Sequence, residues 1–296
     1  MKIFDCFMYF DEEIVLDLRL NTLNDFVDYF VIVESSFTHR GDKRELRFDH
    51  KKFSKFKDKI IYLVYDQEPI SIEKVYEDDS EEEKSRKYIF NSAYRENGQR
   101  NFIIHGLTKA EKNDLIIVSD VDEIPNLENI NFERIREKII LFKQDMFYYK
   151  FNLKLPDLTW AGSKACKKKN LINPQWLRNI KDRKYSFFRI DTIFSKTKYT
   201  GIKFIEDGGW HFSNIKTAKD IEFKLKSYLH HREFDVNPMT TNQIEDIIKN
   251  KQAIYDLKVD KKINKIGDGS KLEKYSINKL PKYLQLNNDK YKKWID

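Results

Sequence analysis

Apolar residues in the first 120 positions follow two alternating patterns. Short β-branched or aromatic runs predict strands at 2–8, 29–33, 59–64 and 114–120. Apolar residues at helical spacing predict helices at 12–23 and 81–107. The last strand has an unbroken apolar centre, Leu-Ile-Ile-Val, which is typical of a strand covered on both faces. This alternation predicts an α/β fold with an open sheet of parallel strands, whose ligands bind beyond the carboxyl ends of the strands.

The pattern changes after residue 125. Residues 145–153 and 185–194 are predicted strands of a more mixed sheet, and residues 216–231 and 243–255 are predicted helices. The chain shows no internal repeat and no linker rich in Pro, Gly or Ser. The simplest partition is therefore one domain over 1–235 with a basic helical C-terminal extension over 236–296.

Composition favours a folded globular protein. The chain has 296 residues, of which 40% are hydrophobic and 14% aromatic, so a disordered or collagen-like polymer is excluded. No run approaches the roughly 18 apolar residues that a bilayer span needs, and acids stand where a signal peptide would keep its apolar run. The two cysteines, Cys6 and Cys166, are too few for a disulfide framework or a cysteine zinc site. We therefore expect a cytoplasmic protein.

Positive charge is concentrated at the C-terminal end. Residues 251–296 contain 12 Lys and 6 acidic residues, so this stretch carries six of the seven net positive charges. We expect no nucleic-acid partner, because no element of the predicted core interleaves Lys and Arg with aromatic residues. Two interpretations of the tail stay open: a solvated lysine-rich surface, or peripheral contact with an anionic membrane.

The acidic motif at 119–125, Ser-Asp-Val-Asp-Glu-Ile-Pro, closes the most apolar predicted strand. Carboxylates at the dry end of a strand are costly unless a positive charge compensates them. Asp120 and Asp122 would bind a hard divalent cation, Mn²⁺ or Mg²⁺, which keeps open positions for phosphate oxygens. The structural alternative is that Asp122 caps the following segment or stabilises a turn at the end of the strand.

Several segments, taken together and in order, resemble glycosyltransferase family 17. They are Asp-Cys-Phe-Met-Tyr-Phe-Asp-Glu-Glu at 5–13, Tyr-Phe-Val-Ile-Val-Glu-Ser-Ser-Phe-Thr-His at 29–39, Arg-Glu-Asn-Gly-Gln-Arg at 95–100, Asp-Val-Asp-Glu-Ile-Pro at 120–125, and Gly-Trp-His-Phe-Ser at 209–213. The resemblance runs from residue 3 to about residue 235. It implies a GT-A-like open mixed sheet with a Rossmann-like nucleotide-binding half, an Asp-x-Asp metal site and an acceptor half.

The resemblance also implies which residues bind the donor in the first half of the chain. Phe7 and Met8 at the end of the first strand, Glu34 at the end of the second and His39 on the following loop would line the nucleotide pocket. The alternatives are core packing for Phe7 and Met8, and turn-forming hydrogen bonds for His39.

Further donor contacts are expected on the long helix and after the central strands. Arg100 is the preferred contact to the diphosphate, because a guanidinium matches phosphate oxygens bidentately. Arg95 is assigned to the same site, with a solvated helix face as its alternative. Trp160 would stack on a sugar, and Gly162 would let the backbone approach the ligand closely; a plain turn is the alternative.

The segment Asp-Gly-Gly-Trp-His at 207–211 is the second candidate cluster. By the resemblance, His211 would be the third metal ligand, with a structural, hydrogen-bonded imidazole as the alternative. Asp207 would be the general base that removes a proton from the acceptor hydroxyl, with a turn-stabilising role before Gly-Gly as the alternative.

The expected function is a metal-dependent, inverting glycosyltransferase that moves a sugar, GlcNAc from UDP-GlcNAc, onto a hydroxyl of a glycan or glycolipid. Two other classes stay open at this point. A metal-dependent phosphoesterase also uses carboxylates near strand ends. A non-catalytic carbohydrate- or membrane-binding module would need only the aromatic residues and the basic tail.

Overall fold

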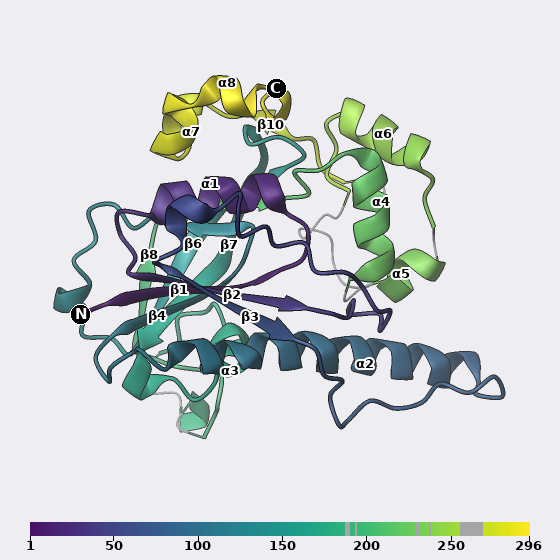
Figure 1. Ribbon diagram of the computed structural model, residues 1–296, viewed down its shortest axis with the longest axis horizontal. Helices are drawn as coiled ribbons and strands as arrows, with labels where there is room; N and C mark the ends of the chain where they lie inside the picture. Colours follow the sequence, from purple (N-terminus) through teal and green to yellow (C-terminus); the bar gives the residue numbers. More distant parts are fainter. Residues whose placement is uncertain (187–189, 193, 229–230, 237, 255–268) are drawn as a thin grey trace.

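The N-terminal half of the sheet is parallel. The computed structural model describes residues 1–186, 190–192, 194–228, 231–236, 238–254 and 269–296. Its parallel strands are β1 (Ile3–Tyr9), β2 (Tyr29–Ser35), β3 (Ile60–Tyr65) and β4 (Leu115–Asp120), in the spatial order β3-β2-β1-β4. These strands confirm the four that the apolar runs predict, within one or two residues at each end. Their carboxyl ends meet at the same edge of the sheet (Figure 1).

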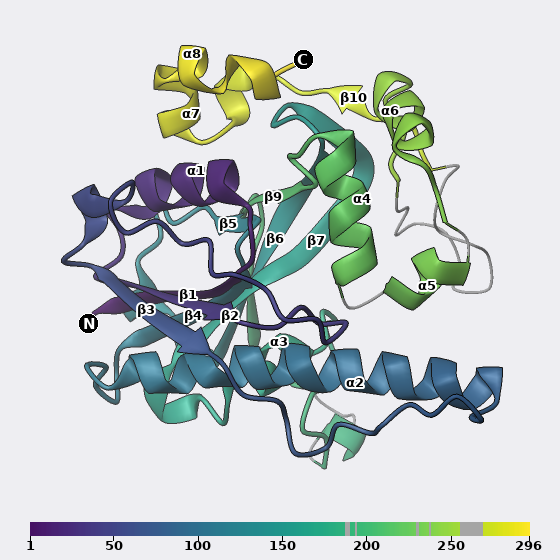
Figure 2. The same ribbon diagram turned by 45° about the vertical axis from the view of Figure 1, so that its right-hand side comes forward.

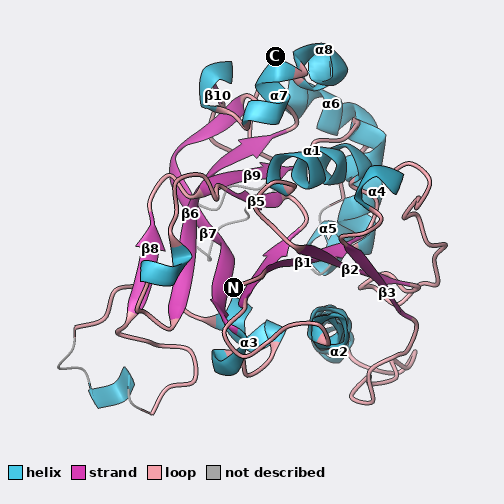
Figure 3. Cartoon of the chain, turned by 60° about the vertical axis from the view of Figure 1, so that its left-hand side comes forward, coloured by secondary structure: helices cyan, strands magenta, loops and turns pink. Residues whose placement is uncertain are grey.

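The second half of the sheet is mixed. The long strand β7 (Leu153–Lys167) pairs antiparallel with β4 and with β6 (Ile139–Tyr148), so it joins the two halves. Three shorter strands complete this half: β8 (Ile202–Ile205), β9 (Gly209–Ser213) and β5 (Glu123–Pro125). Strands β8 and β9 pair parallel with β6, and β5 pairs antiparallel with β9. The predicted α/β class and mixed sheet are confirmed, and the sheet is strongly curled (Figure 3).

Two strand predictions after residue 125 differ from the structure. The run 145–153 is the end of β6, a turn, and the start of β7, because Tyr149 takes a left-handed backbone conformation with φ of 61°. The predicted strand at 185–194 is wrong over its described residues, where Ile190–Thr192 forms a 3-10 turn. This run includes Asp191, a residue type that strands disfavour; residues 187–189 and 193 lie outside the described part.

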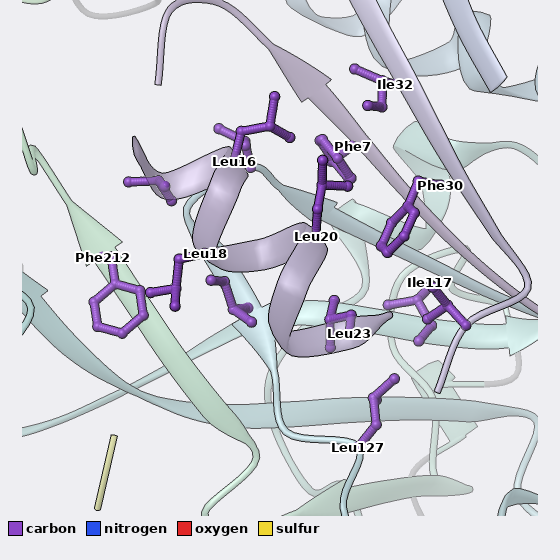
Figure 4. Close-up of a cluster of buried hydrophobic side chains, with 14 of the residues drawn as sticks. Phe7, Leu16, Leu18, Leu20, Leu23, Phe30, Ile32, Ile117, Leu127 and Phe212 are labelled. Atoms are coloured by element: carbon purple, nitrogen blue, oxygen red, sulfur yellow. The ribbon is translucent and has the colours of Figure 1, made fainter. Parts of the chain in front are cut away.

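Helices cover both faces of the parallel half (Figures 1 and 3). On one face lies α1 (Glu13–Leu23), whose leucines pack onto the sheet. Figure 4 shows Leu16, Leu20 and Leu23 of this helix close to Phe7 and other buried side chains of the sheet. Burial of these apolar groups is the main force that attaches the helix, since each buried leucine contributes about 1.5–3 kcal/mol.

The opposite face is covered by α2 (Glu81–Asn101) and α3 (Pro174–Asn179). Helix α2 begins with a capping box, in which the Ser80 hydroxyl accepts from the Glu83 backbone N–H and the Glu83 carboxylate accepts from the Ser80 N–H. The predicted helix at 81–107 is thus confirmed to residue 101, and Phe102–Leu107 continues as a 3-10 helix.

Three helices stand beyond the carboxyl ends of β1, β2 and β3 (Figures 1 and 2). They are α4 (Ala218–Ser227), α5 (His231–Val236) and α6 (Thr241–Lys249). Apolar residues of α4 and α6, such as Ile221 and Ile244, form a core cluster with Met146 and Tyr148 of β6. These helices therefore form one wall beside the edge where the parallel strands end.

The C-terminal residues pack on the body of the molecule. The two-residue strand β10 (Glu273–Lys274) pairs with β7, and α7 (Lys282–Leu286) and α8 (Asn288–Tyr291) lie over α1 (Figure 2). Leu284 and Tyr291 are fully buried in the cluster that holds α1. The division between 1–235 and 236–296 stays a prediction, and residues 237 and 255–268 lie outside the described part. No helix among the described residues is long and apolar enough to cross a bilayer.

Candidate functional site

A cavity of about 370 Å³ opens at the carboxyl ends of β1, β2 and β4. Its walls come from the loops after these strands, from α2, from β6 and β9, and from α4. Residues that line it include Met8, Phe10, Glu12, Phe37, His39, Arg44, Glu96, Gln99, Asp120, Asp122, Met146, Tyr148, Trp160, His211, Lys224 and Tyr228. Four carboxylates and several basic side chains thus share one partly enclosed space, the arrangement expected where a charged ligand binds.

Asp120, the last residue of β4, is bound by two arginines. Its Oδ1 lies 3.0 Å from Nη2 of Arg100 on α2, and its Oδ2 lies 2.9 Å from Nη2 of Arg178 on α3. Burial alone would raise the pKa of Asp120, but the two guanidinium groups outweigh it and hold the pKa well below its usual value. Asp120 is therefore ionised, and its charge is compensated within the protein.

The backbone of the acidic motif is held from the core side by Arg19 of α1. Its Nη1 donates to the carbonyl oxygens of Asp120, Val121 and Glu123 at 3.1, 3.2 and 2.7 Å. The same guanidinium makes two hydrogen bonds to Asp5 of β1, and both side chains are fully buried. Three hydrogen bonds from Arg19 thus fix the turn between β4 and β5, which carries the acidic residues, and two more anchor the arginine to β1.

Asp122 lies against His211 and Lys224. Its Oδ1 is 3.5 Å from Nε2 of His211, and its Oδ2 is 3.9 Å from Nζ of Lys224. Burial would raise the pKa of Asp122, but the two neighbours outweigh it and lower the pKa. Burial would lower the pKa of His211, and the Asp122 carboxylate outweighs it and raises the pKa. The antiparallel pairing of β5 with β9, which sets Glu123 opposite His211, brings these distant residues together.

Two of the three predicted metal ligands, Asp122 and His211, lie close to each other. The described residues contain no group of three or more His, Cys, Asp or Glu side chains already gathered as ligands. Oδ1 of Asp122 and Nε2 of His211 are one oxygen and one nitrogen donor 3.5 Å apart, and the other ring nitrogen of His211, Nδ1, is buried with no hydrogen-bond partner among the described residues. Both Asp120 oxygens are paired with arginines. An oxygen and a nitrogen donor of this kind fit a divalent ion that keeps open positions for a ligand, so Asp122 and His211 would hold such an ion if it binds here.

Other predicted residues also reach the cavity. Met8, His39 and Trp160 line it together with the acidic pair and His211. Nε2 of His39 lies 3.2 Å from Oε1 of Gln99 on α2, and burial lowers the pKa of His39, so its imidazole is neutral at pH 7. The indole N–H of Trp160 donates to Glu123 at 2.7 Å, which fixes the ring beside His211.

Phe7, Glu34 and Arg95 do not line the cavity. Phe7 points to the opposite face of β1 from Met8 and is buried under Arg19, because side chains alternate along a strand. Glu34 is fully buried and accepts hydrogen bonds from Arg44, Tyr62 and the backbone of 47 and 48. Arg95 pairs with Glu68 and donates to the carbonyls of 39 and 40, so it supports the loop after β2. Their predicted donor contacts do not fit these positions.

Arg100 and Gly162 support cavity residues from behind. Arg100 binds Asp120 and Glu96, which both line the cavity, but does not line it itself. Gly162 lies inside β7, where an added Cβ would come within 2.7 Å of the Glu123 carboxyl carbon and 2.2 Å of Gln144 Oε1. The glycine is thus required by packing against Glu123 and Gln144, not by approach of a ligand.

Asp207 lies away from the cavity. It stands in the turn before β9 with φ of 50°, whereas the opposite end of that strand, at Ser213, reaches the cavity. The left-handed backbone indicates that Asp207 stabilises the turn, because Asp tolerates this conformation better than most residues. The predicted role as general base does not fit this placement.

Four further charged residues complete the site. Glu12 and Lys224 line the cavity, while Arg19 and Arg178 hold the acidic motif. Glu12 stands inside the Asp-Cys-Phe-Met-Tyr-Phe-Asp-Glu-Glu segment, which is a sequence signal for it. Nothing in the local sequence indicates the others, since each acts on residues far away in the chain.

Comparison with known proteins identifies the family of the chain. Residues 1–295 match the family described as Glycosyltransferase family 17. The chain belongs to glycosyltransferase family 17. The predicted family and enzyme class are thereby confirmed, and the match covers the C-terminal segment as well as the segments that carry the resemblance.

Relatives within glycosyltransferase family 17 are distant. The chain is 25% identical over 228 residues to the human and the rat β-1,4-mannosyl-glycoprotein 4-β-N-acetylglucosaminyltransferases, and 24% identical to that of the mouse. These alignments cover 72% of this chain and 40% of each relative. The chain thus spans about two fifths of the length of the curated relatives it matches.

Proposed function

We propose that this family 17 chain transfers GlcNAc from UDP-GlcNAc to a hydroxyl of a glycan. The observation that carries the proposal is the acidic cavity at the carboxyl ends of β1, β2 and β4, where open α/β sheets bind nucleotides. The parallel half of the sheet beside a mixed half supports a GT-A-like architecture. The relatives are named for GlcNAc transfer to a mannosyl glycoprotein, which supports the donor and a glycan acceptor.

We also propose that the reaction uses Mn²⁺ or Mg²⁺. Asp122 and His211 would bind the ion, and Lys224 already balances part of the charge on Asp122. A divalent ion in such a place supplies positive charge for the departing nucleoside diphosphate. Arg178 and Arg100 keep Asp120 ionised and fixed, so the cavity presents one oriented carboxylate even before a ligand enters.

Glu12 is the best placed general base. Of the four carboxylates in the cavity, Asp120 is paired with arginines, Glu96 accepts from Arg100 at 2.7 Å, and Asp122 adjoins His211. Oε2 of Glu12 accepts two backbone N–H groups, whereas its Oε1 has no hydrogen bond to a described residue and lies 3.8 Å from two lysines. Burial would raise the pKa of Glu12, but Lys216 and Lys224 lower it, so the group is ionised and able to accept a proton.

A transfer assay tests the proposed function. The protein is incubated with a panel of UDP-sugars, a mannose-containing glycan and Mn²⁺, and the products are identified by mass spectrometry. We expect a mass increase of one GlcNAc on the glycan with UDP-GlcNAc. Hydrolysis of nucleotides or phosphodiesters without sugar transfer would support the phosphoesterase, and glycan binding indifferent to UDP and Mn²⁺ would support a binding module.

Substitution of Glu12 tests the assignment of the base. Glu12→Gln keeps the shape of the side chain and should lower kcat by about 10²- to 10⁴-fold with little change in KM for the donor, because only proton transfer is lost. The matched control is Glu13→Gln, since Glu13 is exposed and pairs with Lys52. Loss of activity in Asp207→Asn, with activity retained in Glu12→Gln, would contradict the assignment and restore Asp207.

A further inference from the structure

Lys224 lines the cavity, and its ammonium makes no hydrogen bond to a described residue. It lies on α4, its side chain is 20% exposed, and it lines the cavity between two carboxylates. Its Nζ is 3.8 Å from Oε1 of Glu12 and 3.9 Å from Oδ2 of Asp122. Both distances are too long for a hydrogen bond, although both carboxylates compensate its charge. Lys224 has no other ion pair or hydrogen bond through its ammonium to a described residue.

Lys216, the neighbouring lysine, has a different arrangement. Its ammonium is in direct contact with the Asp11 carboxylate and also lies 3.8 Å from Glu12. Lys216 is therefore paired with Asp11 in the loop after β1. The three N–H donors of Lys224, in contrast, have no acceptor within hydrogen-bonding distance in the described part of the chain and are available to a ligand.

The ligand of the proposed function requires such a donor. A nucleoside diphosphate brings several negative charges into a cavity that already holds four carboxylates. The two arginines beside the cavity, Arg100 and Arg178, are already paired with Asp120. An ammonium group binds phosphate as a compact point charge with donors that can rotate. Because Lys224 lies beside Asp122, its charge reaches the place where the metal and the phosphates would meet.

We propose that Lys224 donates to a phosphate oxygen of the nucleoside diphosphate. This contact stabilises the bound nucleotide whether or not the divalent ion is present. This inference rests on the proposed function, because it assigns a residue to the donor subsite of that site. The alternative is that Lys224 serves only as a counter-ion for Glu12 and Asp122, in which case it contributes to folding and not to recognition of phosphate.

Titrations with UDP and uridine separate these alternatives. Binding of each to the full chain is followed by ligand-observed NMR, once with EDTA and once with Mn²⁺. Lys224→Met should weaken UDP binding at least about tenfold in both conditions, as expected for loss of a charge-assisted hydrogen bond. Uridine, which lacks phosphate, should bind the variant as it binds the wild type, and Lys224→Arg should recover part of the affinity for UDP.

Lys226→Met is the matched control, since Lys226 lies on the same helix but is exposed and pairs with Glu222. It should bind UDP as the wild type does. Equal affinity of Lys224→Met and the wild type for UDP would overturn the assignment of Lys224 but not the proposed function. So would an equal weakening of UDP and uridine binding in Lys224→Met. Failure of the wild type to bind UDP both with EDTA and with Mn²⁺ would overturn the proposed function itself.

Discussion

Single residues hold the acidic motif from outside the cavity. Arg19 binds three carbonyl oxygens of the turn, and Arg178 binds the carboxylates of both Asp120 and Glu123. Each arginine brings a positive charge that offsets the cost of buried carboxylates. The motif therefore has a fixed backbone and fixed charges before any ligand or ion binds.

The contact between His211 and Asp122 predicts a pH dependence. Because the folded-state pKa of His211 is raised above 6.5, the contact adds to stability fully below pH 6.5 and is lost as the pH rises through the folded pKa. The stability advantage of the wild type over His211→Gln, measured by urea denaturation in the absence of metal, should therefore be largest below pH 6.5 and decrease above it. An advantage that grows with pH over this range would contradict the contact.

An NMR titration of the histidine ring protons gives a direct check. The His211 signal is assigned by its absence in His211→Gln. In Asp122→Asn the pKa of His211 should fall, because the partner that outweighs burial is gone. An unchanged pKa would show that Asp122 is not the partner.

At the scale of elements, the C-terminal helices stabilise α1. Leu284 of α7 is fully buried in the cluster around α1, and the hydroxyl of Tyr291 donates to Asp17 of α1 at 2.5 Å. Helix α1 is thus covered by the sheet on one side and by α7 and α8 on the other. Since α1 carries Arg19, these contacts also support the acidic motif.

Two leucines of α7 test this packing. Leu284→Ala should lower the free energy of unfolding by about 2–5 kcal/mol, because it removes buried methyl groups and leaves a cavity. Leu286→Ala on the same helix should change it by less than about 0.5 kcal/mol, because Leu286 is 84% exposed. Denaturant unfolding curves give both values, and equal effects would contradict the described position of α7.

Elements were predictable where the sequence pattern is local. The four parallel strands and α1 follow from apolar runs and helical spacing, and the acidic motif follows from its place after β4. The end of β6 could not be predicted, because the turn at Tyr149 interrupts an apolar run without Gly or Pro. Six residues predicted for the site line the cavity, and their roles stay predictions: Met8, His39, Asp120, Asp122, Trp160 and His211. Arg178 and Lys224 could not be predicted, because their positions depend on contacts between distant segments.

For the whole molecule, the charged tail is partly paired with the body. Lys290 lies 2.6 Å from Asp17 on α1, and Lys282 lies 2.9 Å from Glu128. Such exposed pairs contribute little individually, about 0–1 kcal/mol each. Peripheral contact with an anionic membrane and a cytoplasmic location both stay predictions.

The long-range sheet pairing creates the site. Asp122 and His211 are 89 positions apart in the chain and meet because β5 and β9 pair at one end of the sheet. The cavity exists only when the parallel half, the mixed half and α4 are all in place. Its chemistry is therefore a property of the complete fold.

A calorimetric titration shows whether a divalent ion at Asp122 takes part in binding the nucleotide-sugar. UDP-GlcNAc is titrated into the wild type and into Asp122→Asn, with and without Mn²⁺. We predict that Mn²⁺ strengthens UDP-GlcNAc binding to the wild type. The gain in affinity should be at least about tenfold smaller in Asp122→Asn, as expected when a metal site is damaged. Affinity that is indifferent to both Mn²⁺ and the substitution, or no binding at all, would contradict the account.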